Sequence, residues 1–127
     1  MLFFKLFIVC GLIIVGALSV EAADMELQLV DKNCWIKVFD DTKYDSDDPH
    51  VKVQGPIEYA SLKNLSGRDW NIEIQSVIVG SGAMVLACKD KDFKGTEIAF
   101  APGQRIPDLS QLDMSNHIES MKITCGR

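Results

Sequence analysis

The stretch that decides the fold runs from residue 84 to residue 112 and reads MVLACKDKDFKGTEIAFAPGQRIPDLSQL. A short apolar run is followed by a charged turn, a second short run and Pro102-Gly103. Two such runs around a polar turn predict a β-hairpin, and a Pro-Gly pair predicts a loop after it. The stretch therefore predicts two strands and then a loop.

The same order of segments occurs earlier in the chain, between residues 36 and 65. An apolar strand pattern, an acidic turn, a second strand and Gly55-Pro56 follow one another. Each copy then ends in an apolar run that opens with a serine, Ser76 in the first and Ser120 in the second. An internal repeat of this length predicts two related structural units. Both loops are also followed by two leucines: Leu62 and Leu65, and Leu109 and Leu112.

The first 22 of the 127 residues have the composition of a secretory signal peptide. Residues 6–18 are apolar, Lys5 precedes them, and the small residues around position 22 predict cleavage before Ala23. The alternative is an uncleaved membrane anchor, for which this run is short against the ~20 residues of a spanning helix. We expect a mature protein that is secreted or periplasmic, with no stable membrane span.

The remaining residues suffice for one domain. The formal net charge of −5 is unchanged by the cleavage, because the removed segment holds one Lys and one Glu. A net negative chain without clustered Lys and Arg argues against nucleic acid as a partner. We expect a lead-in at residues 23–33 and one domain at residues 34–127, divided into units at 34–81 and 82–127.

Alternation of apolar and polar residues is clearest at residues 34–39 and predicts a half-buried strand. A strand is also expected at residues 74–79, and no stretch of the mature chain has the 3.6-residue period of a long helix. Short strands with turns every 8 to 12 residues are typical of an all-β sandwich or barrel.

The repeated pattern resembles the βγ-crystallin Greek key, in which an aromatic-x4-aromatic-x-Gly hairpin is followed by a strand that a serine opens. Two such keys make one two-sheet β-sandwich domain, and the resemblance covers the whole mature chain. This chain departs from the family pattern at Ser46, where the family has glycine, and at Cys88, where it has the first aromatic residue. The matching residues are Phe39, Tyr44 and Ser76 in the first key, and Phe93, Gly95 and Ser120 in the second.

Physical chemistry explains the pattern independently of the family. A glycine after the second aromatic residue can take a positive φ in a tight hairpin. The ring then covers that backbone, and the hydroxyl of the strand-opening serine can hydrogen-bond back to the hairpin.

The resemblance also implies calcium, which the family often binds through a loop reading N/D-N/D-x-x-S/T-S in each key. The matching segments are residues 71–76 and 115–120, and both are degenerate. Ile72 replaces an acidic or amide residue, and Gln75 and Glu119 replace hydroxyl ligands. We expect weak or vestigial binding, with the second loop the better candidate through Asn116 and Glu119. The candidate ligands are Asn71, Glu73, Gln75, Ser115, Asn116, His117 and Glu119.

Other candidate sites have simpler interpretations. The acidic turn does not fit an EF-hand, because Pro49-His50 falls where its glycine should be. It is interpreted as a solvated turn. His50 and His117 lack further ligands at zinc spacing. The acidic turn contains Asp40, Asp41, Asp45, Asp47 and Asp48.

Catalytic motifs are not evident in the sequence. Neither Ser76 nor Ser120 lies in Gly-x-Ser-x-Gly. Cys88 could be a nucleophile with a histidine partner, but a lone cysteine is more often a small apolar filler. Because no acid–base pair or cofactor-binding loop is present, we expect a protein that is not an enzyme.

Three cysteines remain after the expected cleavage, so one is left unpaired. Alternation points Cys34 and Cys125 inward and Cys88 the other way, which predicts a Cys34–Cys125 disulfide with Cys88 free. A Cys88–Cys125 pair between neighbouring strands is the alternative.

Taken together, the sequence predicts an exported, non-enzymatic structural or binding module, monomeric, with an unidentified protein or envelope partner. The alternative is a small secreted effector on the same fold, either a protease inhibitor or a growth-inhibiting toxin. Such an inhibitor needs a rigid exposed loop, for which residues 40–49 are the long candidate.

Overall fold

The computed structural model of the protein describes residues 31–126. The expected signal peptide at residues 1–22 and most of the lead-in lie outside the described residues. Within residues 31–126 there is no α-helix. The strands are β1 (Trp35–Phe39), β2 (His50–Gln54), β3 (Ile57–Tyr59), β4 (Ser76–Val79), β5 (Ala83–Asp90), β6 (Lys94–Phe100), β7 (Arg105–Ile106) and β8 (Ser120–Cys125). Three short 3₁₀ turns are η1 (Thr42–Tyr44), η2 (Lys91–Phe93) and η3 (Leu109–Leu112).

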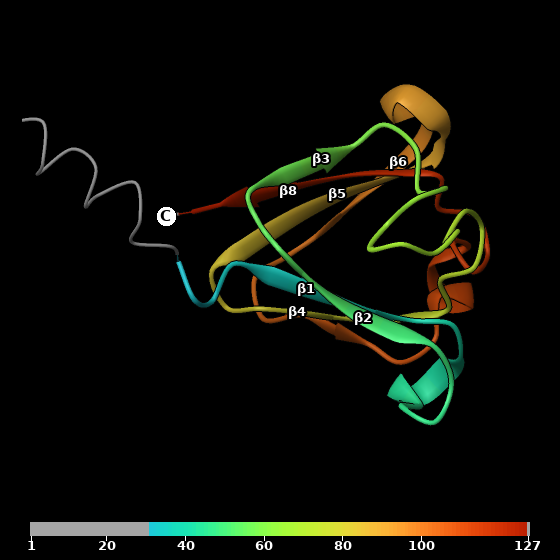
Figure 1. The fold of residues 1–127 in the computed structure, drawn as a ribbon, viewed down its shortest axis with the longest axis horizontal. Helices are drawn as coiled ribbons and strands as arrows, with labels where there is room; N and C mark the ends of the chain where they lie inside the picture. The colour runs from blue at the N-terminus through green and yellow to red at the C-terminus, as the bar shows by residue number, and fades with distance from the viewer. Residues whose placement is uncertain (1–30, 127) are drawn as a thin grey trace, which may run out of the picture. The chain divides into compact units, whose positions relative to one another are not determined.

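The strands form two antiparallel four-stranded sheets that face each other (Figure 1). One sheet has the order β2-β1-β4-β7 and the other the order β3-β8-β5-β6. β3 therefore leaves the first repeat to pair with β8, and β7 leaves the second repeat to pair with β4. Each repeat supplies one strand to the sheet of the other, which confirms the predicted all-β, two-sheet Greek key sandwich.

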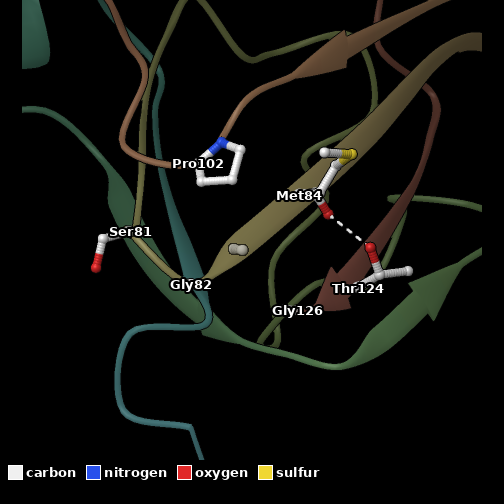
Figure 2. A pocket seen from close by; sticks show the side chains of 7 residues that line it. Ser81, Gly82, Met84, Pro102, Thr124 and Gly126 are labelled. Carbon is white, nitrogen blue, oxygen red and sulfur yellow. Dashed lines mark hydrogen bonds between the residues drawn. The ribbon is translucent and has the colours of Figure 1, made fainter.

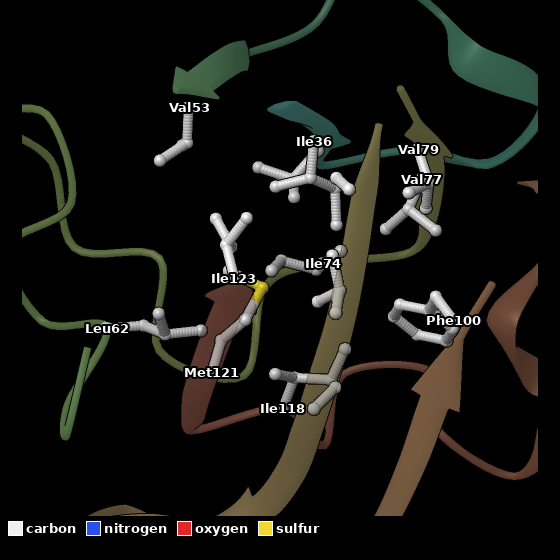
Figure 3. Packing of buried hydrophobic residues seen from close by; sticks show 14 of the residues in the cluster. Ile36, Val53, Leu62, Ile74, Val77, Val79, Phe100, Ile118, Met121 and Ile123 are labelled. Atoms are coloured by element: carbon white, nitrogen blue, oxygen red, sulfur yellow. The ribbon is translucent and has the colours of Figure 1, made fainter. Parts of the chain in front are cut away.

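The core lies between the two sheets and follows the predicted alternation (Figure 3). Ile36 and Val38 of β1 are fully buried, while Lys37 between them faces outward and is half-buried. From the opposite sheet, Val85 of β5 and Ile123 of β8 pack into the same cluster. Burial of such side chains contributes about 1.5–3 kcal/mol each, which makes this cluster the main source of stability.

Two local expectations are corrected by the structure. The strand predicted from residue 74 begins at Ser76, because the Ile74 carbonyl accepts a hydrogen bond from the Asn116 N–H rather than from a strand. The two pairs of leucines are also not equivalent: Leu65 is fully buried, but Leu112 is 37% exposed.

Each repeat is closed by a buried serine hydroxyl that bridges two backbone groups of the preceding hairpin. Ser76 Oγ donates to the Asp41 carbonyl (2.6 Å) and accepts from the Tyr44 N–H (3.1 Å). In the second repeat, Ser120 Oγ donates to the Asp90 carbonyl (2.5 Å) and accepts from the Phe93 N–H (3.0 Å). The two contacts are the same in both repeats. We call this arrangement the serine clamp.

The glycine of the hairpin pattern is required in only one repeat. Gly95 has a φ of +79°, and a Cβ there would lie 2.5 Å from Asp90 Oδ2. Ser46, the counterpart of Gly95 in the first repeat, does not have a positive φ. Both hairpins contain two left-handed residues, Lys43 and Tyr44 or Asp92 and Phe93. Only the second has a further positive φ, at Gly95 beyond the extended Lys94, so the first hairpin tolerates a serine at this position.

Replacement of Ser120 by alanine should destabilise the fold. The change leaves the Phe93 N–H and the Asp90 carbonyl without their partner at a partly buried site, which we expect to lower the free energy of unfolding by about 1–3 kcal/mol. Urea unfolding followed by tryptophan fluorescence measures the loss. Ser81→Ala, at an exposed serine, is the matched control, and equal stability of the two variants would contradict the clamp.

The disulfide joins Cys34, just before β1, to Cys125 at the end of β8, with a Cα–Cα distance of 5.4 Å. Cys88 is free and buried. The pairing predicted from alternation is confirmed, because it places the two inward-facing cysteines at the same end of the sandwich.

The Cys34→Ala/Cys125→Ala double variant should lose much of its stability. The bond closes a loop across 91 residues of sequence, for which chain entropy gives about 4–5 kcal/mol. Guanidinium unfolding of the double variant and of the reduced wild type should give the same loss. Alkylation of Cys34 or Cys125 in the denatured, unreduced protein would contradict the pairing.

Candidate calcium site

The two loops predicted to bind calcium lie against each other at one end of the sandwich. The Ile72 N–H donates to the Ile118 carbonyl (3.1 Å), and the Asn116 N–H donates to the Ile74 carbonyl (3.1 Å). Each loop thus holds the other through the same pair of positions, although they are far apart in sequence. The side chains of Ile74 and Ile118 are fully buried beneath this junction.

The second position of each loop has a left-handed backbone. Ile72 has a φ of 53° and Asn116 a φ of 59°. Asparagine tolerates this conformation, but a β-branched residue does so rarely and under strain. Ile72 is also 46% exposed, so neither backbone conformation nor burial explains an isoleucine there.

Several oxygen atoms of the loops are free to accept a ligand. Asn71 Oδ1 is buried and has no hydrogen-bond partner, although an unpartnered buried polar atom is costly. Within residues 31–126, no backbone N–H donates to the carbonyls of Glu73 and His117. Carbonyl, amide and carboxylate oxygens are the ligands that calcium prefers.

The first loop is already held by contacts within the protein. The Gln75 side-chain amide donates to the Asp40 carbonyl (3.0 Å), and the Asp40 carboxylate is paired with Arg68 (2.9 Å). The Arg68 guanidinium lies 4.3 Å from the centre of the Trp70 ring. With Ile72 lacking an oxygen, this loop offers few ligands beyond Asn71 and backbone carbonyls.

The second loop fits a cation better. In the part of the chain that the structure describes, the side chains of Ser115, Asn116 and Glu119 make no hydrogen bond or ion pair. Asn116 and His117 are exposed, while Ser115 and Glu119 are half-buried. The serine of each pattern, Ser76 or Ser120, is occupied by the clamp and is not available as a ligand.

A second group of oxygen atoms comes from the acidic turn that follows β1. The carboxylates of Asp41, Asp45 and Asp48 offer atoms that lie within 4.8 Å of one another, close enough for a metal ion to hold all three. The sequence identified these aspartates only as a solvated turn, because it does not reveal which of the five converge. A hydrogen bond with Asp41 raises the pKa of Asp48 above its ordinary value of 3.8, and partial loss of hydration and nearby carboxylates add to the shift.

Asp48→Asn should raise the melting temperature at pH 7 in the presence of EDTA. A carboxylic acid whose folded-state pKa is raised destabilises the fold above that pKa and ceases to do so below the unfolded value. The gain should therefore be largest at neutral pH and shrink as the pH falls towards 3.8. Thermal scans from pH 7 to pH 3.5 measure it, with exposed Asp69→Asn as control. A gain that does not depend on pH would contradict the raised pKa of Asp48.

The other candidate groups offer little chemistry. Burial raises the pKa of the Cys88 thiol, which disfavours the nucleophilic thiolate. A cavity of about 440 Å³ lies where β5, β8 and the β6–β7 turn meet (Figure 2). It contains no titratable side chain: its lining residues are Ser81, Gly82, Ala83, Met84, Pro102, Thr124 and Gly126.

Comparison with known proteins gives the same fold. A structure solved in work on the evolution of the eye lens βγ-crystallin domain fold has a TM-score of 0.66 and 20% identity, covering 77% of this chain and 92% of that one. A βγ-crystallin domain from Clostridium beijerinckii has a TM-score of 0.57 and 24% identity, covering 69% and 94%. A βγ-crystallin from Ciona intestinalis has a TM-score of 0.58 and 20% identity, covering 71% and 99%. The chain therefore has the βγ-crystallin fold.

Sequence comparisons are less informative. No protein-family model matches the chain, and none of the curated proteins matches it.

Across residues 31–126 the structure has no helix with the length and hydropathy of a membrane span.

Proposed function

We propose that this chain is an exported, non-enzymatic βγ-crystallin-like module that binds calcium weakly between its two loops. The observation that carries the calcium proposal is the buried, unpartnered Asn71 Oδ1, together with the Glu73 and His117 carbonyls, to which no backbone N–H of residues 31–126 donates. Asn116 and Glu119 would supply an amide and a carboxylate from the second loop. Ser115, Glu73, Gln75 and His117 would add side-chain or carbonyl oxygens.

Weak binding follows from the composition of the first loop. Ile72 offers no side-chain oxygen, and the Gln75 side chain is held by Asp40. Calcium takes six to eight oxygen ligands, and sites that supply fewer from the protein bind it in the ~0.1–1 mM range of extracellular modules. This range suits an environment rich in calcium.

Export is supported by two features. The apolar segment at residues 6–18 has the length of a signal peptide core. The Cys34–Cys125 disulfide is compatible with an oxidising compartment outside the cytoplasm. The intact mass of the exported protein should correspond to a chain that begins at Ala23. A mass that corresponds to another N-terminal residue would contradict the proposed cleavage.

Calcium at 10 mM should stabilise the protein against heat. For a dissociation constant of about 1 mM, mass action gives roughly 1.4 kcal/mol, or several degrees in melting temperature. Asn116→Ala and Glu119→Gln should abolish the shift. Ile72→Asn should enlarge it, because asparagine adds an oxygen and relieves the left-handed strain.

The acidic turn provides the matched control for this experiment. Asp45→Asn/Asp48→Asn should leave the calcium shift unchanged if the loops hold the ion. Loss of the shift in that variant, with retention in Asn116→Ala, would assign calcium to the acidic turn instead. Absence of any shift in the wild type at 10 mM calcium would overturn the proposal.

The effector alternative gains no support from its candidate loop. The Asp40 N–H donates to the Pro49 carbonyl (3.0 Å), and the Lys43 N–H donates to the Pro107 carbonyl (2.7 Å). These contacts fix the turn at its base, but Thr42–Tyr44 within it form a 3₁₀ turn, whereas a segment that enters a protease cleft has to be extended.

A further inference from the structure

A row of three cationic side chains crosses the outer face of the sheet β2-β1-β4-β7. Lys52 lies opposite Lys37, Lys37 lies opposite Ile78, and Ile78 lies opposite Arg105. The row therefore runs across all four strands, with a length of roughly 14 Å from three strand spacings. We call Lys52, Lys37 and Arg105 the cationic row.

The charges of the cationic row are not neutralised within the described part of the chain. No carboxylate of residues 31–126 lies within ion-pair distance of these three side chains. Each is instead placed over an aromatic ring: Lys52 over Trp35 (4.7 Å), Lys37 over Phe39 (5.4 Å) and Arg105 over Tyr44 (5.0 Å). Such contacts hold long, flexible side chains in one place, which lowers the entropy lost on binding a ligand.

The fold itself does not require this row. The other sheet has the same arrangement of four strands. In it, Lys122 corresponds to Ile78, because each lies two residues after a clamp serine. Its neighbours in register are Leu86, Ala99 and Glu58. The two outer faces are therefore equivalent in backbone but differ in charge, so the cationic row is a property of this sequence rather than of the sandwich.

We propose that the cationic row binds a linear acidic polysaccharide. Carboxylate or sulfate groups that repeat along an extended chain match a row of cations in register across the strands of one sheet face. The net charge of −5 repels such a chain at long range. Binding therefore depends on short-range contacts with the row and weakens as salt screens them.

Other anionic partners fit this face less well. Single-stranded nucleic acid requires aromatic faces on which bases stack, but the three rings are covered by the cations. Polybasic attachment to an anionic membrane uses clusters of about four to eight Lys and Arg. The row has three, and the exposed large hydrophobic residues of the described chain, Ile72, Met84 and Leu112, lie on other elements.

Fluorescence anisotropy with labelled polygalacturonate tests the proposal. The purified protein in EDTA at low salt should bind this polymer and dextran sulfate but not neutral dextran. Affinity should fall at least tenfold between 20 and 200 mM NaCl. The Lys37→Gln/Lys52→Gln/Arg105→Gln variant should lose at least tenfold in affinity, whereas Lys122→Gln, a cation that also lies over a ring (Phe93, 4.5 Å), should change it less than twofold.

Charge-retaining changes separate binding from folding. Lys37→Arg/Lys52→Arg/Arg105→Lys should keep the affinity even if the glutamine variant is less stable, as its melting temperature would report. Absence of polygalacturonate binding by the wild type, or equal losses in the triple-glutamine and Lys122→Gln variants, would overturn the proposal. Tighter binding of single-stranded DNA or phosphatidylserine vesicles would overturn the choice of polysaccharide. EDTA makes the result independent of the proposed calcium site.

Discussion

The structure depends on a hydroxyl group that is buried at the start of each closing strand. Ser76 and Ser120 each satisfy one N–H and one carbonyl of a hairpin that turns through left-handed residues. Such a hairpin cannot pair all its backbone groups with itself, and unpaired buried groups are costly. The serine clamp therefore allows a tight, folded hairpin to lie over the sandwich while β4 and β8 start at its base.

The clamp fixes where β4 and β8 begin, and this determines the positions of the loops before them. Because β3 and β7 cross to the opposite sheets, the residues after each of them return over the other repeat. The two candidate calcium loops consequently meet and exchange backbone hydrogen bonds. Any calcium held there would join the two repeats, which the disulfide already joins at Cys34 and Cys125.

The pseudo-symmetric backbone carries unlike chemistry in its two halves. Asn116 suits its left-handed position, whereas the equivalent Ile72 is strained and has no oxygen to offer. Phe39 stacks beside His50 at 5.7 Å, while its counterpart Cys88 is a small, buried thiol. The outer faces differ in the same way: one sheet carries three cations in register, whereas the equivalent row on the other carries one cation and one carboxylate, Lys122 and Glu58. Function is therefore expected where the halves differ rather than where they agree.

The sequence by itself determined the features that arise from neighbouring residues. Alternation identified β1 and the inward cysteines, and the serine-led apolar runs identified β4 and β8. The pattern could not reveal that Ile74 belongs to a loop, because its carbonyl is held by Asn116 from the other repeat.

Only the tertiary structure decided which distant residues meet. The exchange of β3 and β7, the convergence of three of the five aspartates and the alignment of Lys52, Lys37 and Arg105 depend on strand register. Register is set by the packing of a common core across more than forty residues of sequence, and no local pattern contains that information.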